Sequence, residues 1–191
     1  NTWKWHTFHL SDARFANGLN HGSDFRIRRE AAGALEYFYL NRVIVDDRIE
    51  RAKDGQPMVS SEIVVVASLL KREDLKHANV TLRGVSSKAF EVRQGIRLTQ
   101  GRSFTPGLDE VIVGVRIADR IHGLGVGESF KAQKRSWTVV GHFAAEGGAF
   151  ESEIWGDLDV MGPAFQRTGG ANSVVFRLKD VTTLPAFAEE I

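Results

Sequence analysis

The sequence predicts an α+β fold on the basis of three observations. Segments with the length and composition of strands outnumber those with helical periodicity. Strands and helices do not alternate regularly, which argues against a doubly wound parallel sheet. The 191 residues are 42% hydrophobic and 26% charged, as is ordinary for a soluble globular protein with a sizeable core.

The first third of the chain predicts two strands and one helix. Thr2–Leu10 is rich in Trp, Thr and Phe and favours a strand. Asp24 can cap a helix over Phe25–Ala32, because its carboxylate can accept from the free amides of the first turn. Leu35–Val45 is aromatic and β-branched and favours a second strand. Ala52–Pro57 contains Gly and Pro and predicts a turn.

The next elements surround a continuous apolar run. Ile63–Leu70 has strand length and no polar alternation, so it predicts a strand buried on both faces. Lys71–His77 is a charged connection, and Val80–Val85 alternates as a strand does. A short helical turn at Ser87–Phe90 and a strand near Ile96–Leu98 complete this part.

The second half continues with short strands and short helices. Glu110–Val113 predicts a strand that leads into a helix over Val115–His122. Ser129–Gln133 and Trp137–Phe143 predict a hairpin joined at Lys134-Arg135.

Three elements are predicted at the end of the chain. Asp157 or Asp159 can cap a short helix that runs toward Phe165. Ser173–Leu178 predicts the last strand. Leu184–Ile191 has helical spacing and predicts a terminal helix.

The acidic run near residue 150 is the first candidate for chemistry. In an extended segment Glu151 and Glu153 would share one face and form a carboxylate pair, as in an acid/base or metal site. Solvated or salt-bridged carboxylates beside the apolar Ile154-Trp155 are the favoured interpretation. The glycines of Gly123–Gly127 follow a helix and precede a strand, so they predict a helix stop and a turn rather than a nucleotide-binding loop.

Composition and motifs exclude several functions. The absence of Cys excludes disulfides, thiolate metal sites and a cysteine nucleophile. The sequence has no Walker A motif and no Gly-x-Ser-x-Gly nucleophile elbow. The formal charge of +1 gives no long-range attraction to nucleic acid or anionic lipid. No apolar run approaches the roughly 20 residues that a membrane-spanning helix needs.

Nine short segments occur in an order that is more informative than any one of them. They are Gly55–Pro57, Ser60–Ile63, Ala78–Val85, Gln100–Phe104, Leu108–Gly114, Gly125–Glu128, Trp137–Phe143, Phe150–Trp155 and Ser173–Leu178. This ordered set resembles the extracytoplasmic core domain of ABC transporter permeases of the MacB/FtsX type. The resemblance covers roughly Gly55 to Leu178, whereas residues 1–54 depart from the family pattern.

The resemblance implies an architecture of two lobes. Residues 1–77 and 153–191 would form a ferredoxin-like porter lobe built from both chain ends. Residues 78–152 would form an inserted, mostly β lobe, and the run Phe150–Asp157 would be the junction between the lobes. The structural and junction candidates in the matched segments are Glu151, Glu153, Ile154, Trp155, Arg83, Gly84, Gly114, Gly127 and Gly141.

The resemblance also implies location, partners and function. The domain would lie on the periplasmic side of the inner membrane, held by transmembrane helices before Asn1 and after Ile191. It would be non-catalytic and hold no cofactor, and ATP would bind to a separate ABC ATPase subunit. Further implied partners are a second permease subunit and a periplasmic adaptor protein or a lipid, lipoprotein or peptide substrate, with no nucleic acid.

Two other functions stay open at the level of sequence. The chain could be a free-standing periplasmic ligand- or lipoprotein-binding module, which a signal peptide without later membrane spans would favour. It could also be a hydrolase that uses Glu151 and Glu153, which would require loss of activity in a folded Glu153→Gln variant.

Overall fold

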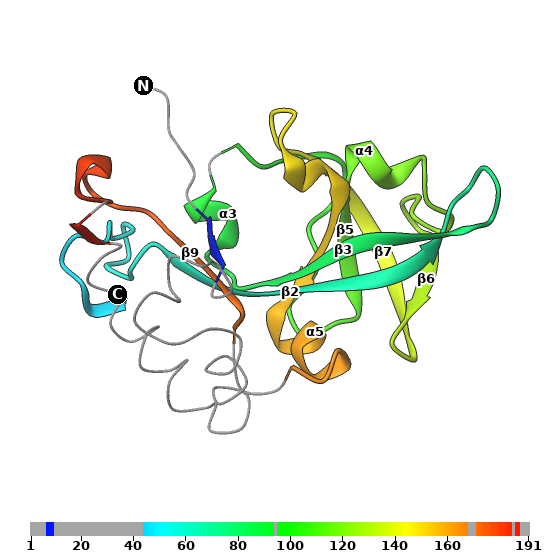
Figure 1. Ribbon diagram of the computed structural model, residues 1–191, viewed down its shortest axis with the longest axis horizontal. Coiled ribbons are helices and arrows are strands. Elements are labelled where there is room, and N and C mark those ends of the chain that lie inside the picture. The colour runs from blue at the N-terminus through cyan, green and yellow to red at the C-terminus, as the bar shows by residue number, and fades with distance from the viewer. Residues whose placement is uncertain (1–6, 10–43, 94, 168–170, 185, 188–191) are drawn as a thin grey trace.

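The longest feature of the computed structural model is an antiparallel pair of strands, β2 (Val59–Leu70) and β3 (His77–Val85). The structure describes residues 7–9, 44–93, 95–167, 171–184 and 186–187. The register pairs Glu62 with Val85 at one end and Leu70 with His77 at the other, so the predicted charged connection joins the two strands. Figure 1 shows this pair running along the long axis of the molecule.

Seven further strands of the described residues join this pair in one mixed sheet. The order is β1-β9-β2-β3-β8-β5-β7-β4, with β6 paired to β7. The β3–β8 and β5–β7 pairs are parallel, and the other pairs are antiparallel. The added strands are β1 (Thr7–His9), β4 (Arg97–Gly101), β5 (Glu110–Gly114), β6 (Ser129–Ala132), β7 (Arg135–Ala144), β8 (Glu153–Asp157) and β9 (Ser173–Phe176).

The named helices of the described residues are all short. They are α3 (Ala89–Val92), α4 (Val115–Ala118), α5 (Leu158–Ala164) and the 3₁₀ turns η1 (Ala149–Ser152) and η2 (Val181–Thr183). Asp157 caps α5 as predicted, because its side chain accepts from the backbone N–H of Asp159 at 3.2 Å. None of the helices in the described ranges is long and apolar enough to span a bilayer. A mainly stranded sheet with a few short helices confirms the predicted α+β class.

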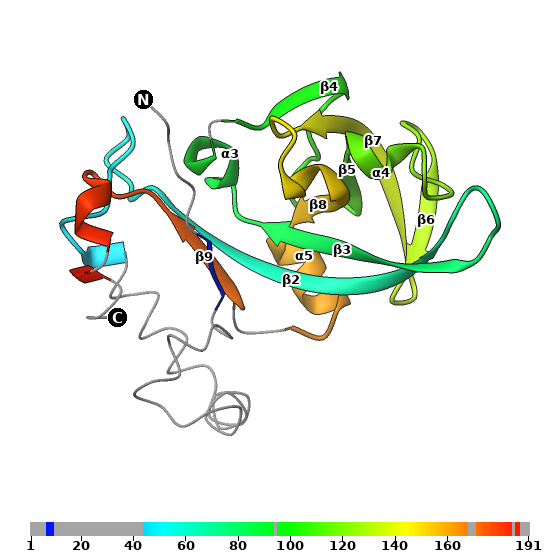
Figure 2. The same ribbon diagram turned by 45° about the horizontal axis from the view of Figure 1, so that its top comes forward.

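The hydrophobic core lies on both faces of the sheet. On one face Ile63, Leu82 and Ile154 pack with residues of α5. On the other face Ile112 and Trp155 belong to a smaller aromatic cluster near α3 and η1. Figure 2 shows α3 and α5 on opposite sides of the β2–β3 pair. The alternation of strand side chains therefore places neighbours such as Ile154 and Trp155 in different clusters.

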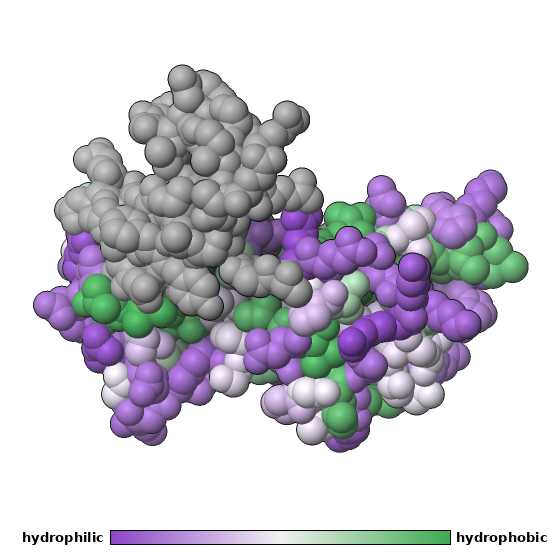
Figure 3. Space-filling view, turned by 90° about the horizontal axis from the view of Figure 1, so that it is seen from below, coloured by the Kyte–Doolittle hydropathy of each residue, from purple (hydrophilic) through white to green (hydrophobic). Residues whose placement is uncertain are grey.

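The apolar run in β2 differs from its prediction. It is buried on both faces only near its start, because Val66 is 59% exposed and Leu70 is 40% exposed. Beyond residue 65 the strand alternates, with Ala67 and Leu69 buried and Ser68 exposed. The second cluster does not extend over this end of the strand, so one face meets solvent. In Figure 3, hydrophobic and hydrophilic side chains are interspersed over the part of the lower face that grey atoms do not cover.

Other predicted elements form with shifted boundaries. The predicted helix over Val115–His122 ends at Ala118, and Ile121 instead forms an isolated bridge with Lys71 of the β2–β3 connection. The hairpin between β6 and β7 turns at Gln133-Lys134, where both residues have positive φ, as a type I′ turn requires.

Some of the remaining predictions fall wholly or partly outside the described residues. The predicted helix over Phe25–Ala32 lies there entirely. Of the predicted strand Leu35–Val45 only residues 44 and 45 are described, and they are helical. Of the first strand the described part is β1, and of the terminal helix it is residue 184 with residues 186–187.

Candidate functional site: a buried charge chain

Four charged side chains lie together inside the molecule, and we call them the charge chain: Glu62 of β2, Arg83 of β3, Glu153 of β8, and Arg93, which follows α3. Their exposed fractions are 0%, 3%, 8% and 1%, respectively. Burial of a charge is costly unless it is paired and hydrogen-bonded. The partners of these four groups therefore decide whether this part of the fold is stable.

The strand registers bring three of the four charges together. In the antiparallel β2–β3 pair Glu62 lies opposite Val85, two residues along from Arg83 on the same face. In the parallel β3–β8 pair Arg83 lies opposite Trp155, two residues along from Glu153. Each carboxylate is thus a diagonal neighbour of Arg83, which is a distance that long side chains can reach.

The fourth charge comes from the segment that follows β3. Helix α3 has only four residues, with Ala89 and Val92 buried. Arg93 is its C-terminal cap residue. The end of this short helix therefore places the guanidinium of Arg93 against the sheet, where it contacts Glu62.

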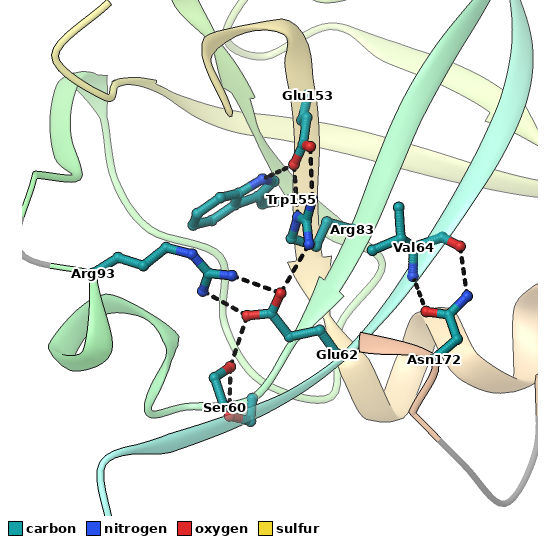
Figure 4. A network of polar contacts seen from close by, with 9 residues as sticks. Ser60, Glu62, Val64, Arg83, Arg93, Glu153, Trp155 and Asn172 are labelled. Atoms are coloured by element: carbon teal, nitrogen blue, oxygen red, sulfur yellow. Dashed lines mark hydrogen bonds and ion pairs between the residues drawn. The ribbon is translucent and has the colours of Figure 1, made fainter. Parts of the chain in front are cut away.

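The four side chains alternate in sign and form bidentate pairs (Figure 4). The Nη1 and Nη2 atoms of Arg93 donate to the two carboxylate oxygens of Glu62 at 2.5 and 2.7 Å. Arg83 donates from Nη1 to Glu62 at 3.0 Å, and from Nε and Nη2 to Glu153 at 2.7 Å each. Two forked Arg–Glu pairs are thus linked into one chain with no net charge, the geometry in which guanidinium and carboxylate bind most strongly.

Each of the two carboxylates also accepts a hydrogen bond from an uncharged donor. The Ser60 hydroxyl donates to Glu62 Oε1 at 2.9 Å. The indole Nε1–H of Trp155 donates to Glu153 Oε2 at 2.8 Å. Each buried carboxylate therefore accepts hydrogen bonds from an arginine and from an uncharged donor, which offsets the loss of water.

Aromatic rings lie against the two guanidinium groups. The Cζ atoms of Arg83 and Arg93 are 5.2 and 5.0 Å from the centre of the Phe150 ring. Arg93 also lies 5.1 Å from the Trp155 ring centre. Its Nε atom is buried without a hydrogen-bond partner in the part of the chain that the structure describes. Arg83, in contrast, donates from Nε, Nη1 and Nη2, so Arg93 is the less completely satisfied end of the charge chain.

The electrostatic balance keeps Arg83 charged. Burial alone lowers the pKa of Arg83, because the interior disfavours the cation. The hydrogen bond and charge of Glu153, followed by the charge of Glu62, outweigh burial and hold the pKa above its usual value. A guanidinium in this position does not act as an acid or a base.

Glu151 belongs to a different contact, so the Glu151/Glu153 pair that the sequence left open as an alternative does not form. Its Oε1 accepts from the backbone N–H groups of Ala145 and Gly147, each at 2.9 Å, and Arg116 pairs with its Oε2 at 3.2 Å. The amides of Ala145 and Gly147 hold the pKa of Glu151 below its usual range, with a smaller contribution from Arg116. A shared face would have required an extended segment, whereas residues 149–152 form a 3₁₀ turn. Glu151 and Glu153 are also buried rather than solvated, and both are salt-bridged.

The four glycines predicted as structural candidates fall into two kinds. A Cβ atom would lie 2.8 Å from the nearest atom at Gly84, 2.2 Å at Gly114 and 2.3 Å at Gly141, all too close for a side chain. At Gly114 that atom is the backbone carbonyl oxygen of Glu151, so the missing side chain lets η1 rest directly on β5. Gly127 is different, because it has open space around it and a φ of +88°.

The site holds structural elements together and offers no reactive group. Every carboxylate of the charge chain is engaged by an arginine. Among the residues that the structure describes, no group of three or more His, Asp or Glu side chains could hold a metal ion. Ile154 and Trp155, expected in the core, are both fully buried.

Sequence reasoning missed two members of the charge chain. Glu62 was noted only as part of the segment Ser60–Ile63, and Arg93 was not singled out. A signal was available for Glu62, because it immediately precedes an apolar strand run, and a charged residue buried at that position needs a partner of opposite sign. No comparable signal marks Arg93, since its place depends on the direction of α3.

A family model described as the MacB-like periplasmic core domain matches residues 9–191, which extends the resemblance into the N-terminal part of the chain. The chain therefore belongs to the family of MacB-like periplasmic core domains. A comparison with functionally curated proteins finds no match.

Two solved structures share the fold. The extracellular domain of the noncanonical ABC-type transporter YknZ from Gram-positive bacteria has a TM-score of 0.59 and 15% identity, covering 94% of this chain and 86% of that one. The periplasmic region of MacB from Actinobacillus actinomycetemcomitans has a TM-score of 0.52 and 17% identity, covering 78% of this chain and 69% of that one. At these identities the two structures show a shared fold, and the family assignment rests on the family model over residues 9–191.

Proposed function

We propose that this domain is a non-catalytic part of a permease subunit that couples cytoplasmic ATP hydrolysis to export or to a mechanical signal across the inner membrane. The single observation that carries the proposal is the family match over residues 9–191. The charge chain supports the non-catalytic part of the proposal, because both of its carboxylates are engaged by arginines.

The same proposal assigns the partners. ATP binds to a separate ABC ATPase subunit, and this domain holds no cofactor. Transmembrane helices outside these 191 residues connect the two and associate with a second permease subunit. A periplasmic adaptor protein, or a lipid, lipoprotein or peptide, is the partner on the periplasmic side. Division into a porter lobe (1–77 and 153–191) and an inserted lobe (78–152) is part of the same proposal.

The first test is the complete reading frame of the permease. The proposal expects an apolar segment of about 20 residues before Asn1 and further ones after Ile191. A frame that lacks both would contradict the proposal, and a signal peptide without later spans would favour the free-standing binding module.

The second test measures movement. In the complete permease with its ATPase, a spin label at residue 131 of each subunit reports the distance between the two domains. Lys131 is exposed on β6, and these 191 residues contain no Cys, so only cysteines elsewhere in the permease and in the ATPase have to be replaced before labelling. We expect this distance to change when the ATPase is trapped with ATP and vanadate. An unchanged distance would contradict the proposed coupling.

A further inference from the structure

Glu62 is the residue where two different connections of β2 meet. The ladder between β9 and β2 begins at Phe176–Val59 and ends at the pair Ser173–Glu62. Beyond Glu62, β2 continues to Leu70 without β9 beside it. The carboxylate of Glu62 also accepts hydrogen bonds from both arginines of the charge chain. The side-chain connection therefore begins where the backbone connection ends.

From Glu62 the charge chain crosses the sheet. Arg83 of β3 donates both to Glu62 and to Glu153, which is the first residue of β8. Arg93, in the segment after α3, also donates to Glu62. Displacement of β2 relative to β8 would thus separate buried opposite charges without water to replace their partners, which is strongly unfavourable.

The part of the molecule on the β9 side has its own small clusters. Ile49, Val59 and Phe187 form one of them, and Met58, Val92 and Val175 form another. The cores near β8 are separate clusters. Figures 1 and 2 show residues 44–58 and β9 at one end of the β2–β3 pair, with β5, β6 and β7 toward the other. The charge chain lies between these two ends.

We propose that Glu62 couples the β9 end of the domain to β8 and η1, so that the two ends move as one rigid body. The inference rests on the proposed function, in which movement that enters from the membrane has to reach the rest of the domain. It assigns Glu62 a positioning role, exerted through Arg83 and Arg93.

The test breaks the link without leaving a net buried charge. In the double variant Glu62→Gln/Arg93→Met one acid and one base are removed together, and the Arg83–Glu153 pair remains. The matched control is Glu110→Gln/Arg102→Met, which removes a bidentate Arg–Glu pair outside the charge chain, where Arg102 is half-exposed. Circular dichroism and thermal unfolding establish that each variant is folded.

The measurement is a distance within one subunit of the complete permease. Spin labels replace Lys179, which is exposed beyond β9, and Lys131 of β6 in one subunit only, and the second subunit carries no label, so that no distance between subunits contributes. In the otherwise unchanged protein and in the control we expect one narrow distance distribution that is the same with and without trapped ATP. In Glu62→Gln/Arg93→Met we expect the distribution to broaden about twofold or more, because the two ends can then open locally.

A narrow, unchanged distribution in a folded Glu62→Gln/Arg93→Met variant would overturn the inference, and so would equal broadening in the control. If the double variant does not fold, Arg93→Lys takes its place, because lysine keeps the charge but loses the fork, and a smaller broadening is expected. The distance between subunits tests the proposed function separately. That distance can fail to respond to ATP while the distance within a subunit still reports whether Glu62 couples the two ends.

Discussion

Two bidentate Arg–Glu pairs of this domain have the same chemistry and opposite surroundings. Glu62 lies with Arg93 and Arg83 in the interior, whereas Glu110 pairs with Arg102 at the surface, where Arg102 is half-exposed. In the interior each charge needs its partner, because water cannot take the partner's place. When Glu110 is replaced, water can solvate the half-exposed Arg102. The comparison indicates that burial decides how much stability is lost when one partner of an ion pair is removed. Four predictions test this difference.

Loss of Glu62 should have the largest effect. Glu62→Gln leaves two buried guanidinium groups with one carboxylate between them, and we expect the free energy of unfolding to fall by roughly 3–5 kcal/mol. Urea denaturation of the 191-residue chain measures the change. A loss no greater than that of Glu110→Gln would contradict the distinction between the two pairs.

Displacement of Phe150 from the two guanidinium groups should have the next largest effect. In Gly114→Ala the new Cβ would lie 2.2 Å from the carbonyl oxygen of Glu151, so η1 and Phe150 must shift away from the guanidinium groups. We expect a loss of about 1–3 kcal/mol in thermal or urea unfolding. The control is Gly95→Ala, where the Cβ would meet only the flexible Glu146 side chain at 3.2 Å. Equal losses in the two variants would argue against this close contact.

Removal of both members of one buried pair should cost less than removal of one. We expect Glu62→Gln/Arg93→Met to be more stable than Glu62→Gln alone by about 0.5–3 kcal/mol. In the double variant the remaining arginine, Arg83, is still paired with Glu153, whereas in Glu62→Gln the buried Arg93 has lost its carboxylate. A double-mutant cycle with Arg93→Met supplies the coupling energy. Strict additivity of the two changes would show that the pair is not energetically linked.

The surface pair should give the smallest effect and a distinct pH dependence. The hydrogen bond from Arg102, followed by the backbone N–H of Thr105, holds the pKa of Glu110 at about 2, below its ordinary 4.5. A lowered pKa in the folded state adds stability above the ordinary value, and this stability is lost as the pH falls through 4.5 toward about 2. We expect Glu110→Gln to cost roughly 0.2–1 kcal/mol at neutral pH.

Thermal unfolding of the Glu110→Gln variant and the unchanged chain from neutral to acid pH provides the measurement. The difference between the two should shrink over that acid range and vanish near its lower end. A difference that stays constant with pH would show that the carboxylate does not contribute through its charge.

Sequence patterns predicted most strands, because alternation and β-branched content depend on local residues. Val80–Val85, Trp137–Phe143 and Ser173–Leu178 correspond to β3, β7 and β9 within a few residues. The turn at Gln133-Lys134 was placed one residue late, since neither residue is the Asn or Gly that usually marks a type I′ turn.

The site could be predicted only in part. Arg83 and Glu153 were among the candidates, but the sequence could not show that they face one another, because the parallel β3–β8 register joins segments 70 residues apart. The alternative of a Glu151/Glu153 pair depended on an extended segment, which the 3₁₀ turn over residues 149–152 replaces. Long-range register and local helical turns are set by packing, which composition and periodicity do not encode.

One further contact has a consequence for how the chain tolerates change in length. The side-chain amide of Asn172 accepts from the backbone N–H of Val64 at 2.7 Å and donates to its carbonyl oxygen at 2.9 Å (Figure 4). It thus offers β2 the same donor and acceptor as a peptide unit would, one step beyond the last paired residue of β9. Insertions or deletions between α5 and Asn172 should therefore leave the hydrogen bonds of Val64 intact as long as Asn172 stays next to Ser173.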